Sequence, residues 1–216
     1  MEKKVCPACG NEFSCLHTAW CWCTAYKLSK NQLIELNSRY SNCLCPVCIQ
    51  ALNPKRNIPS ADNFQFKLAK TEVDYKTTEA LFREYALLIQ CEHCFVHFEE
   101  ELKILNQMYG APNGGIILVW AGEDVIGCVA IRKMNEGIAE LKRMYLKTEF
   151  RNFGLGKKLL KEAETLAKSL SYHHLYLDTM PKLKPAIHLY ESAGFDRYTP
   201  LFESSVNEII FFRKEL

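Results

Sequence analysis

The chain has 216 residues, 48% of them hydrophobic, and a formal net charge of only +2. This length allows one substantial core and a smaller module, and the charge by itself indicates neither a nucleic-acid partner nor a membrane partner. No run of eighteen apolar residues is present, so we expect no membrane span. The first residues contain no apolar signal core, and we therefore expect a cytoplasmic protein.

Cysteines are concentrated in the first 48 residues. In a cytoplasmic protein such a cluster indicates metal binding rather than disulfide bonds. The two Cys-Pro-x-Cys turns each aim a pair of thiolates at one point, and together they predict a tetrahedral zinc site made of Cys6, Cys9, Cys45 and Cys48. The remaining thiols predict a second zinc site, with His17 as a spare ligand: Cys15, Cys21, Cys23 and Cys43.

Basic residues outnumber acidic ones by seven to three in residues 1–60. A zinc ion with four thiolates has a net charge of −2, so two such sites would bring this region close to neutrality. Binding to nucleic acid is therefore not expected. Trp20 and Trp22 flank Cys21, and we expect them to cover the metal; stacking on bases is the alternative for these two side chains.

The pattern Cys-Pro-x-Cys-Gly-x-x-Phe-x-Cys, then Cys-Trp-Cys, then Cys-Pro-Val-Cys resembles the cysteine-rich CWC domains of bacterial proteins. The resemblance implies a zinc-bound fold and little about activity. Two prolines mark residues 53–62 as a linker. We therefore expect a zinc-binding domain over 1–52 and a second domain over 63–216.

Strand and helix patterns alternate after the linker. Alternation with a period of two predicts strands, and apolar residues at spacings of three and four predict helices. Cys91 and Cys94 fit the apolar face of the first helical region, where we expect them to pack in the core. The order predicts an α/β (α+β) fold with a mixed sheet: strands over 64–68, 116–120, 125–132, 138–146, 174–178, 195–198 and 207–212, and helices over 74–107, 154–170 and 186–193.

Two glycines, Gly154 and Gly156, stand where the strand over 138–146 gives way to a helix. The first N–H groups of a helix have no intrahelical partner, and the helix dipole favours an anion beside them. A phosphate-bearing ligand is therefore expected at this turn. The Gly-x-Gly spacing does not match the dinucleotide-binding or P-loop motifs.

Two motifs in this region resemble the GNAT superfamily of acyl-CoA N-acyltransferases. Residues 151–156 fit the pattern [QR]-x-x-G-x-[GA], and residues 186–195 fit A-x-x-L-Y-x-x-x-G-F. The resemblance implies a GNAT-like mixed, mostly antiparallel sheet flanked by helices, with acetyl-CoA or another acyl-CoA as co-substrate. It also implies the cofactor-binding residues Met144, Tyr145, Leu146, Arg151, Asn152, Phe153, Gly154, Leu155, Gly156 and Lys157.

The same resemblance suggests two catalytic residues. Tyr190 is the candidate general acid for the departing thiolate, and its alternative role is that of a buried aromatic residue. Glu140 is the candidate general base, with pairing to Lys142 or Arg132 as the alternative. Many members of the family have an asparagine where this chain has Leu183, so that cofactor contact is missing or is supplied otherwise.

Three functions are compatible with these patterns. The first is N-acyl transfer, most often N-acetyl transfer, to an amine of undefined identity, with the zinc domain as an accessory. The second is a non-catalytic module that senses acyl-CoA or binds a protein partner through the zinc domain. The third is a zinc-ribbon protein that binds nucleic acid, which the charge balance disfavours. A homodimer is compatible with all three.

Overall fold

The structure is a computed structural model of the chain, and it describes residues 2–15, 30–51, 64–89, 95, 97–151, 153–200 and 209–216. The chain forms two compact units, residues 1–63 with 147–155 and residues 64–146 with 156–216. The predicted linker over 53–62 lies outside the described residues, so the predicted domain boundaries remain a prediction. Within the described ranges, no helix is both long and apolar enough to cross a membrane.

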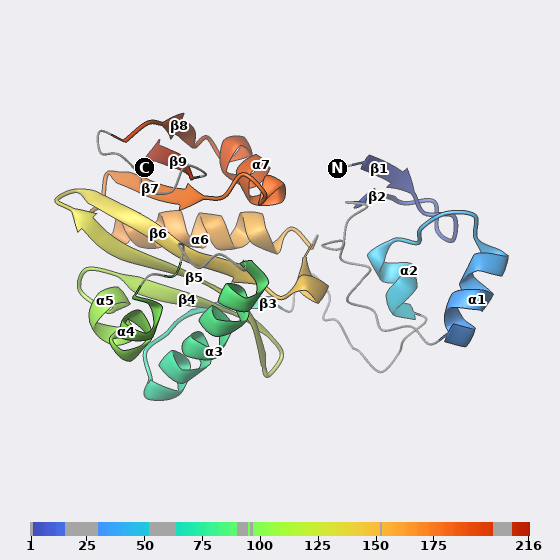
Figure 1. Cartoon of the computed structure of the whole chain (residues 1–216), viewed down its shortest axis with the longest axis horizontal. Helices are drawn as coiled ribbons and strands as arrows, with labels where there is room; N and C mark the ends of the chain where they lie inside the picture. The colour runs from blue at the N-terminus through green and yellow to red at the C-terminus, as the bar shows by residue number, and fades with distance from the viewer. Residues whose placement is uncertain are drawn as a thin grey trace. The chain divides into compact units, whose positions relative to one another are not determined.

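The described part of the N-terminal region contains a β-hairpin and two short helices (Figure 1). Strands β1 and β2 are antiparallel, and helix α2 starts inside the second Cys-Pro-x-Cys turn, where proline suits the first helical position. Cysteines supply much of its small core, which consists of Cys6, Cys15, Leu44, Cys45 and Ile49. The elements are β1 (Glu2–Val5), β2 (Glu12–Cys15), α1 (Lys30–Arg39) and α2 (Pro46–Ala51).

The larger region is built on a seven-stranded sheet with the order β3-β4-β5-β6-β7-β9-β8 (Figure 1). Neighbouring strands are antiparallel except for β6 and β7, which are parallel and are connected through helix α6. The predicted mixed, mostly antiparallel sheet is therefore confirmed. Its strands are β3 (Phe64–Leu68), β4 (Gly115–Ala121), β5 (Asp124–Asn135), β6 (Ile138–Leu146), β7 (His174–Thr179), β8 (Asp196–Tyr198) and β9 (Ile210–Glu215).

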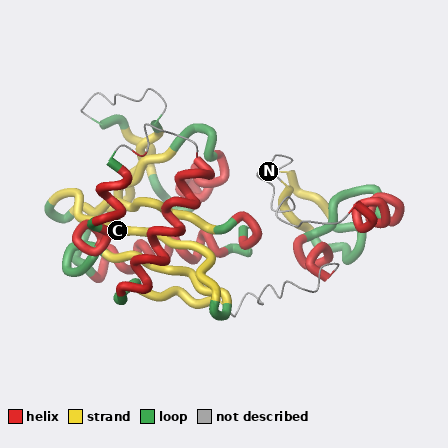
Figure 2. The backbone as a smooth tube through the Cα atoms, turned by 60° about the horizontal axis from the view of Figure 1, so that its bottom comes forward, coloured by secondary structure: helices red, strands yellow, loops and turns green. Residues whose placement is uncertain are grey.

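Helices cover both faces of this sheet (Figure 2). On one face, α3, α4 and α5 enclose a buried cluster with β4, β5 and β6 that includes Phe82, Tyr109 and Tyr145. On the other face, Glu164 of α6 pairs with Lys214 of β9 at 2.6 Å. The helices are α3 (Glu72–Ile89), α4 (Phe98–Lys103), α5 (Leu105–Tyr109), α6 (Leu155–Ser169) and α7 (Lys184–Ser192).

Two of the differences between the predicted elements and the structure have a clear cause. The described part of the helical region contains three helices rather than one or two, because Ile104, at φ −120°, separates α4 from α5. The last strand extends to Glu215 rather than ending at Phe212, because it pairs with β7 along its whole length, from Ile210 opposite Thr179 to Glu215 opposite His174.

Candidate active site and metal centre

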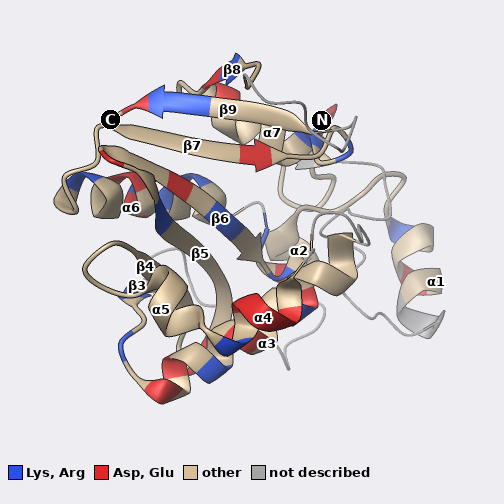
Figure 3. Cartoon of the chain, turned by 60° about the vertical axis from the view of Figure 1, so that its left-hand side comes forward, with Lys and Arg blue, Asp and Glu red and all other residues tan. Residues whose placement is uncertain are grey.

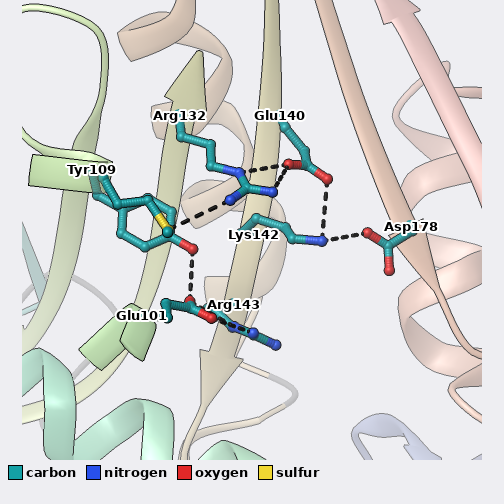
Figure 4. A network of polar contacts seen from close by, with 8 residues as sticks. Glu101, Tyr109, Arg132, Glu140, Lys142, Arg143 and Asp178 are labelled. Atoms are coloured by element: carbon teal, nitrogen blue, oxygen red, sulfur yellow. Dashed lines mark hydrogen bonds and ion pairs between the residues drawn. The ribbon is translucent and has the colours of Figure 1, made fainter. Parts of the chain in front are cut away.

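Strand β6 parts from β7 partway along its length. It pairs with β5 from Ile138 to Leu146 with one interruption at residues 143–144, whereas its parallel pairing with β7 covers only residues 138–140. Beyond that point Lys142 bridges the two strands with its side chain, because its Nζ lies 2.7 Å from Oδ1 of Asp178 (Figure 4). The predicted cofactor contacts at 144–146 lie on this diverging half of β6.

A β-bulge interrupts the same half of the strand. Arg143 and Met144 together oppose the single residue Val129 of β5. Arg143 has a left-handed backbone, with φ 53°, which costs a residue other than glycine about 1–3 kcal/mol. A bulge shifts the alternation of side chains by one residue, so Tyr145 lies on the same face of the sheet as Lys142.

The side chain of Arg143 is held by helix α4. Its Nε and Nη2 donate to the two carboxylate oxygens of Glu101 at 3.0 and 2.5 Å, and Tyr109 donates its hydroxyl to Glu101 at 2.7 Å (Figure 4). The guanidinium carbon also lies 4.4 Å from the ring centre of Phe95 and 5.5 Å from that of Phe98. The bulge of β6 is thus tied to α4 by a nearly buried ion pair.

Burial and charge have opposite effects on the pKa of each residue in this ion pair. Burial would raise the pKa of Glu101, but the hydrogen bonds and charge of Arg143 outweigh it, and this pKa lies below its ordinary value of 4.5. Burial would lower the pKa of Arg143, but Glu101 raises it. Burial, together with the charge of Glu101, raises the pKa of Tyr109. At neutral pH the network therefore contains a carboxylate, a guanidinium and a neutral phenol.

Tyr190, the predicted general acid, faces the bulge from helix α7. Its hydroxyl lies 3.9 Å from the sulfur of Met144. Its ring packs against Phe195 and Phe212, with centroids 5.9 and 5.8 Å away. Burial raises the pKa of Tyr190 well above its ordinary value of 10.0, so the hydroxyl keeps its proton at neutral pH. The structure therefore places a protonated donor beside the diverging half of β6.

Glu140, the predicted general base, is engaged in two ion pairs. Its Oε2 accepts from Nε of Arg132 at 2.7 Å, and its Oε1 lies 3.1 Å from Nζ of Lys142 (Figure 4). The alternative expectation for Glu140, pairing with Lys142 or Arg132, is thus what the structure has. To act as a base, Glu140 would have to give up one of these ion pairs and take a proton from the acceptor amine.

The turn after β6 contains the predicted anion-binding residues. A 3₁₀ helix (Thr148–Phe150) precedes Gly154, whose φ of 73° favours glycine, and α6 begins at the next residue. Arg151, Phe153 and Gly156 are half-buried, Gly154 and Lys157 are exposed, Leu155 is buried, and Asn152 lies outside the described residues.

Packing fixes the orientation of α6. Its apolar side chains at helical spacing are buried, so the helix cannot rotate without exposing them: Leu155, Leu159, Leu160, Ala163 and Ala167. Its first backbone N–H groups have no partner within the helix, and its dipole is positive at this end. An anionic group is therefore favoured at the start of α6.

Four N-terminal thiols form a compact cluster. The sulfur atoms of Cys6, Cys9, Cys45 and Cys48 all lie within 4.8 Å of one another, and those of Cys9 and Cys45 are 3.6 Å apart. Tetrahedral zinc with bonds of about 2.3 Å separates its sulfur ligands by about 3.8 Å. The four residues of the first predicted site therefore offer the ligand type that zinc prefers, in a cluster compact enough for one ion.

The backbone around Cys6 favours its thiolate, whereas burial raises the pKa of Cys45 and of Cys48. Burial raises the pKa of the Cys6 thiol, but nearby N–H groups outweigh it and lower this pKa to about 6. One of them, the N–H of Cys45, lies 3.3 Å from the sulfur. Of the second predicted site, Cys15 is buried and Cys43 is half-buried, whereas Cys21 and Cys23 lie outside the described residues. Trp20, Trp22, His17, Cys91 and Cys94 also lie outside them.

Two polar side chains at this site were not predicted from the sequence. Glu101 pairs with Arg143 over 42 positions of sequence, and Asp178 pairs with Lys142 over 36. A partial signal was present, because an arginine and a lysine interrupt the apolar strand β6 and need partners when they are half-buried. The identity of those partners depends on the tertiary fold.

The chain matches two family models. The acetyltransferase (GNAT) family matches residues 78–195, and the cysteine-rich CWC domain matches residues 6–50. An uncharacterized N-acetyltransferase of Schizosaccharomyces pombe is 31% identical over 157 residues, which cover 71% of this chain and 96% of the relative. The chain therefore belongs to the acetyltransferase (GNAT) family.

Solved structures agree with this assignment of the fold. An acetyltransferase from Streptococcus agalactiae has a TM-score of 0.60 at 18% identity and covers 71% of this chain and 99% of its own. A GNAT family acetyltransferase from Elizabethkingia anophelis, solved with acetyl-CoA bound, has a TM-score of 0.52 at 20% identity and covers 72% and 99%. The predicted acetyltransferase fold after the cysteine-rich segment is thus confirmed.

Proposed function

We propose that the protein is an N-acetyltransferase that moves the acetyl group of acetyl-CoA directly to an amine. The observation that supports it most is the local arrangement of β6 and α6. The strand leaves its parallel neighbour after residue 140, and a helix starts immediately after Gly154. Backbone N–H groups over 151–157 bind the pyrophosphate, and the backbone over 144–146 binds the pantetheine and the thioester.

The reaction forms a bond between the amine nitrogen and the acyl carbon and breaks the bond between that carbon and sulfur. The amine loses a proton, and the departing CoA thiolate gains one. Tyr190 donates that proton, in keeping with its protonated hydroxyl near Met144. Glu140 takes the proton of the amine. An N–H group of β6 at the thioester oxygen would stabilise the negative charge of the tetrahedral intermediate.

In this proposal the zinc-binding region takes no part in the acyl transfer. Cys6, Cys9, Cys45 and Cys48 hold one structural zinc ion, and the cluster geometry supports this assignment. Cys15, Cys21, Cys23 and Cys43 hold a second one. We propose a zinc-binding domain over 1–52, a linker over 53–62 and an acetyltransferase domain over 63–216. The first domain offers a surface for a protein partner, and the protein acts in the cytoplasm.

A titration followed by a turnover screen tests this function. Acetyl-CoA should bind the purified full chain, and release of the CoA thiol should depend on one class of amine in a panel of amino acids, polyamines and peptides. Saturable binding without thiol release from any amine would contradict the enzyme and favour a sensor of acyl-CoA. Failure of acetyl-CoA to bind would contradict the co-substrate itself.

The role of Glu140 requires its own variant. Glu140→Gln keeps the shape of the side chain but cannot accept a proton. If Glu140 is the base, this variant lowers kcat about a hundredfold or more and changes the acidic limb of the pH profile. If only its ion pairs with Arg132 and Lys142 matter, the variant loses stability and keeps the pH profile of the wild type.

A further inference from the structure

We propose that Arg143 and Glu101 are positioning residues of the acyl transfer. Their ion pair holds the bulge of β6 in the conformation that presents the backbone of Met144 to the thioester. The inference rests on the proposed function, because it concerns the same strand. Neither side chain is proposed to contact acetyl-CoA. The pair acts through the backbone of β6.

The conformation of the bulge needs a specific support. Arg143 lies in the left-handed region with φ 53°, where glycine is the usual residue. A strained backbone of this kind persists only where the surroundings over-determine it. In β6 the pairing with β7 has ended before this residue, so the neighbouring strand on that side does not fix it.

The support comes through the side chain of Arg143. Two of its nitrogens donate to Glu101, at 3.0 and 2.5 Å, and the side chains of both residues are at most 10% exposed. Glu101 is itself held by the hydroxyl of Tyr109 at 2.7 Å. A forked guanidinium that meets a carboxylate through two bonds fixes direction as well as distance. The bulge residue is therefore anchored to helix α4 in one orientation.

The bulge decides which way the next residues point. In a regular strand Lys142 and Met144 would share one face, and Arg143 and Tyr145 the other. Here Lys142 and Tyr145 share a face instead, because they pair with Ala130 and Cys128, two positions apart on β5. This face is the one covered by α3 and α4, where Arg143 binds Glu101 and Tyr145 donates to Glu84 at 2.8 Å. Met144 is left to face Tyr190 across the sheet. A regular strand would put Met144 on the same face as Lys142.

A nearby ion pair offers a matched control. Glu99 lies in the same helix α4 and receives two hydrogen bonds from Arg83 of α3, at 2.7 and 2.9 Å. The side chains of Glu99 and Arg83 are both exposed, and neither residue lies on β6. Helices α3 and α4 each contain both acidic and basic residues (Figure 3). Glu99→Gln thus removes a similar carboxylate from the same helix without releasing the bulge.

The carbonyl stretching band of bound acetyl-CoA, labelled with ¹³C at the acetyl carbonyl, tests the proposal directly. A hydrogen bond to the thioester oxygen lowers this frequency, so the band reports the position of the β6 donor independently of turnover. We expect Glu101→Gln and Arg143→Lys to move the band back toward its position in water, while the dissociation constant changes by about twofold or less. Glu99→Gln should keep the wild-type band. With an active amine, kcat of the first two variants should fall about a hundredfold.

The alternatives give distinct results. A wild-type band position in folded Glu101→Gln or Arg143→Lys would overturn the proposal, even if the variant is less stable. Should both variants fail to fold, Tyr109→Phe removes only one hydrogen bond from Glu101, and an unchanged band there would also overturn it. If the wild-type protein binds no acetyl-CoA, the proposed function is wrong and this inference is wrong with it.

Discussion

The hydroxyl of Tyr190 lies 3.9 Å from the sulfur of Met144, so that helix α7 meets strand β6 on the half of the strand that has left its parallel neighbour. If Tyr190 protonates the CoA thiolate, Tyr190→Phe should lower kcat by about 10²–10⁴-fold and leave the dissociation constant of acetyl-CoA nearly unchanged. The measurement is steady-state thiol release with an amine found active in the screen.

Tyr172→Phe is the matched control for this prediction. Its hydroxyl donates to the carbonyl oxygen of Asn113 at 2.8 Å, on a connection unrelated to β6. This variant should keep the wild-type kcat. Equal losses in both variants would show that Tyr190→Phe acts through stability rather than through proton transfer.

The two glycines of the turn should respond differently to alanine. Gly154 has φ 73°, and a left-handed backbone costs alanine about 1–2 kcal/mol. Gly156 has an ordinary helical backbone, and an added Cβ would lie 3.5 Å from Leu189, which is normal contact. Gly154→Ala should therefore raise the dissociation constant of acetyl-CoA about tenfold, and Gly156→Ala should change it about twofold or less. Calorimetric titration measures both, and the reverse order would contradict the predicted anion site.

Metal analysis tests the cysteine cluster. Protein purified without chelator should contain at least one zinc ion per chain, and Cys9→Ser should lower that content by one. Cys9 is exposed, so the serine variant loses little packing apart from the metal. Cys128→Ala, at a buried thiol of strand β5, should keep the zinc content of the wild type. Less than one zinc per chain in the wild type would contradict the site, and loss of a further ion on Cys43→Ser would support the second one.

The Glu101–Arg143 pair should make stability depend on pH. Because the pKa of Glu101 is lower in the folded protein than its ordinary 4.5, its contribution is complete above that value and is lost as pH falls below it. Glu101→Gln should therefore lower the free energy of unfolding by about 3 kcal/mol at pH 7. Urea unfolding at several pH values should show this difference shrinking below pH 4.5. A difference independent of pH would contradict an ionised, paired Glu101.

Local patterns were sufficient to predict much of this chain. The spacing of leucines and alanines predicted α6, the Gly-x-Gly turn predicted its start, and two Cys-Pro-x-Cys turns predicted a thiol cluster that the structure confirms. Each of these patterns is formed by residues that lie close together in the sequence. The resemblance of residues 151–156 and 186–195 to a family then predicted the fold around them.

Tertiary relationships were not predictable in the same way. The bulge at Arg143 could not be predicted from the order of apolar and polar residues at Leu141, Lys142 and Met144. A bulge depends on the register with the neighbouring strand, here β5. Its partner Glu101 lies in a short helix whose boundaries depend on the left-handed backbone of His97. The hairpin of β1 and β2 was also missed, since cysteines supply much of the small core beneath it.

The most direct test of the central claim is an amide NMR titration of the full chain with acetyl-CoA. If β6 and the start of α6 form the acyl-CoA site, the largest shifts should occur over 144–146 and 151–157, with Tyr190 also affected. The amides of α1 and α2 should not shift. Saturable shifts confined to other parts of the chain, or no shifts at all at millimolar acetyl-CoA, would contradict the site and the function proposed from it.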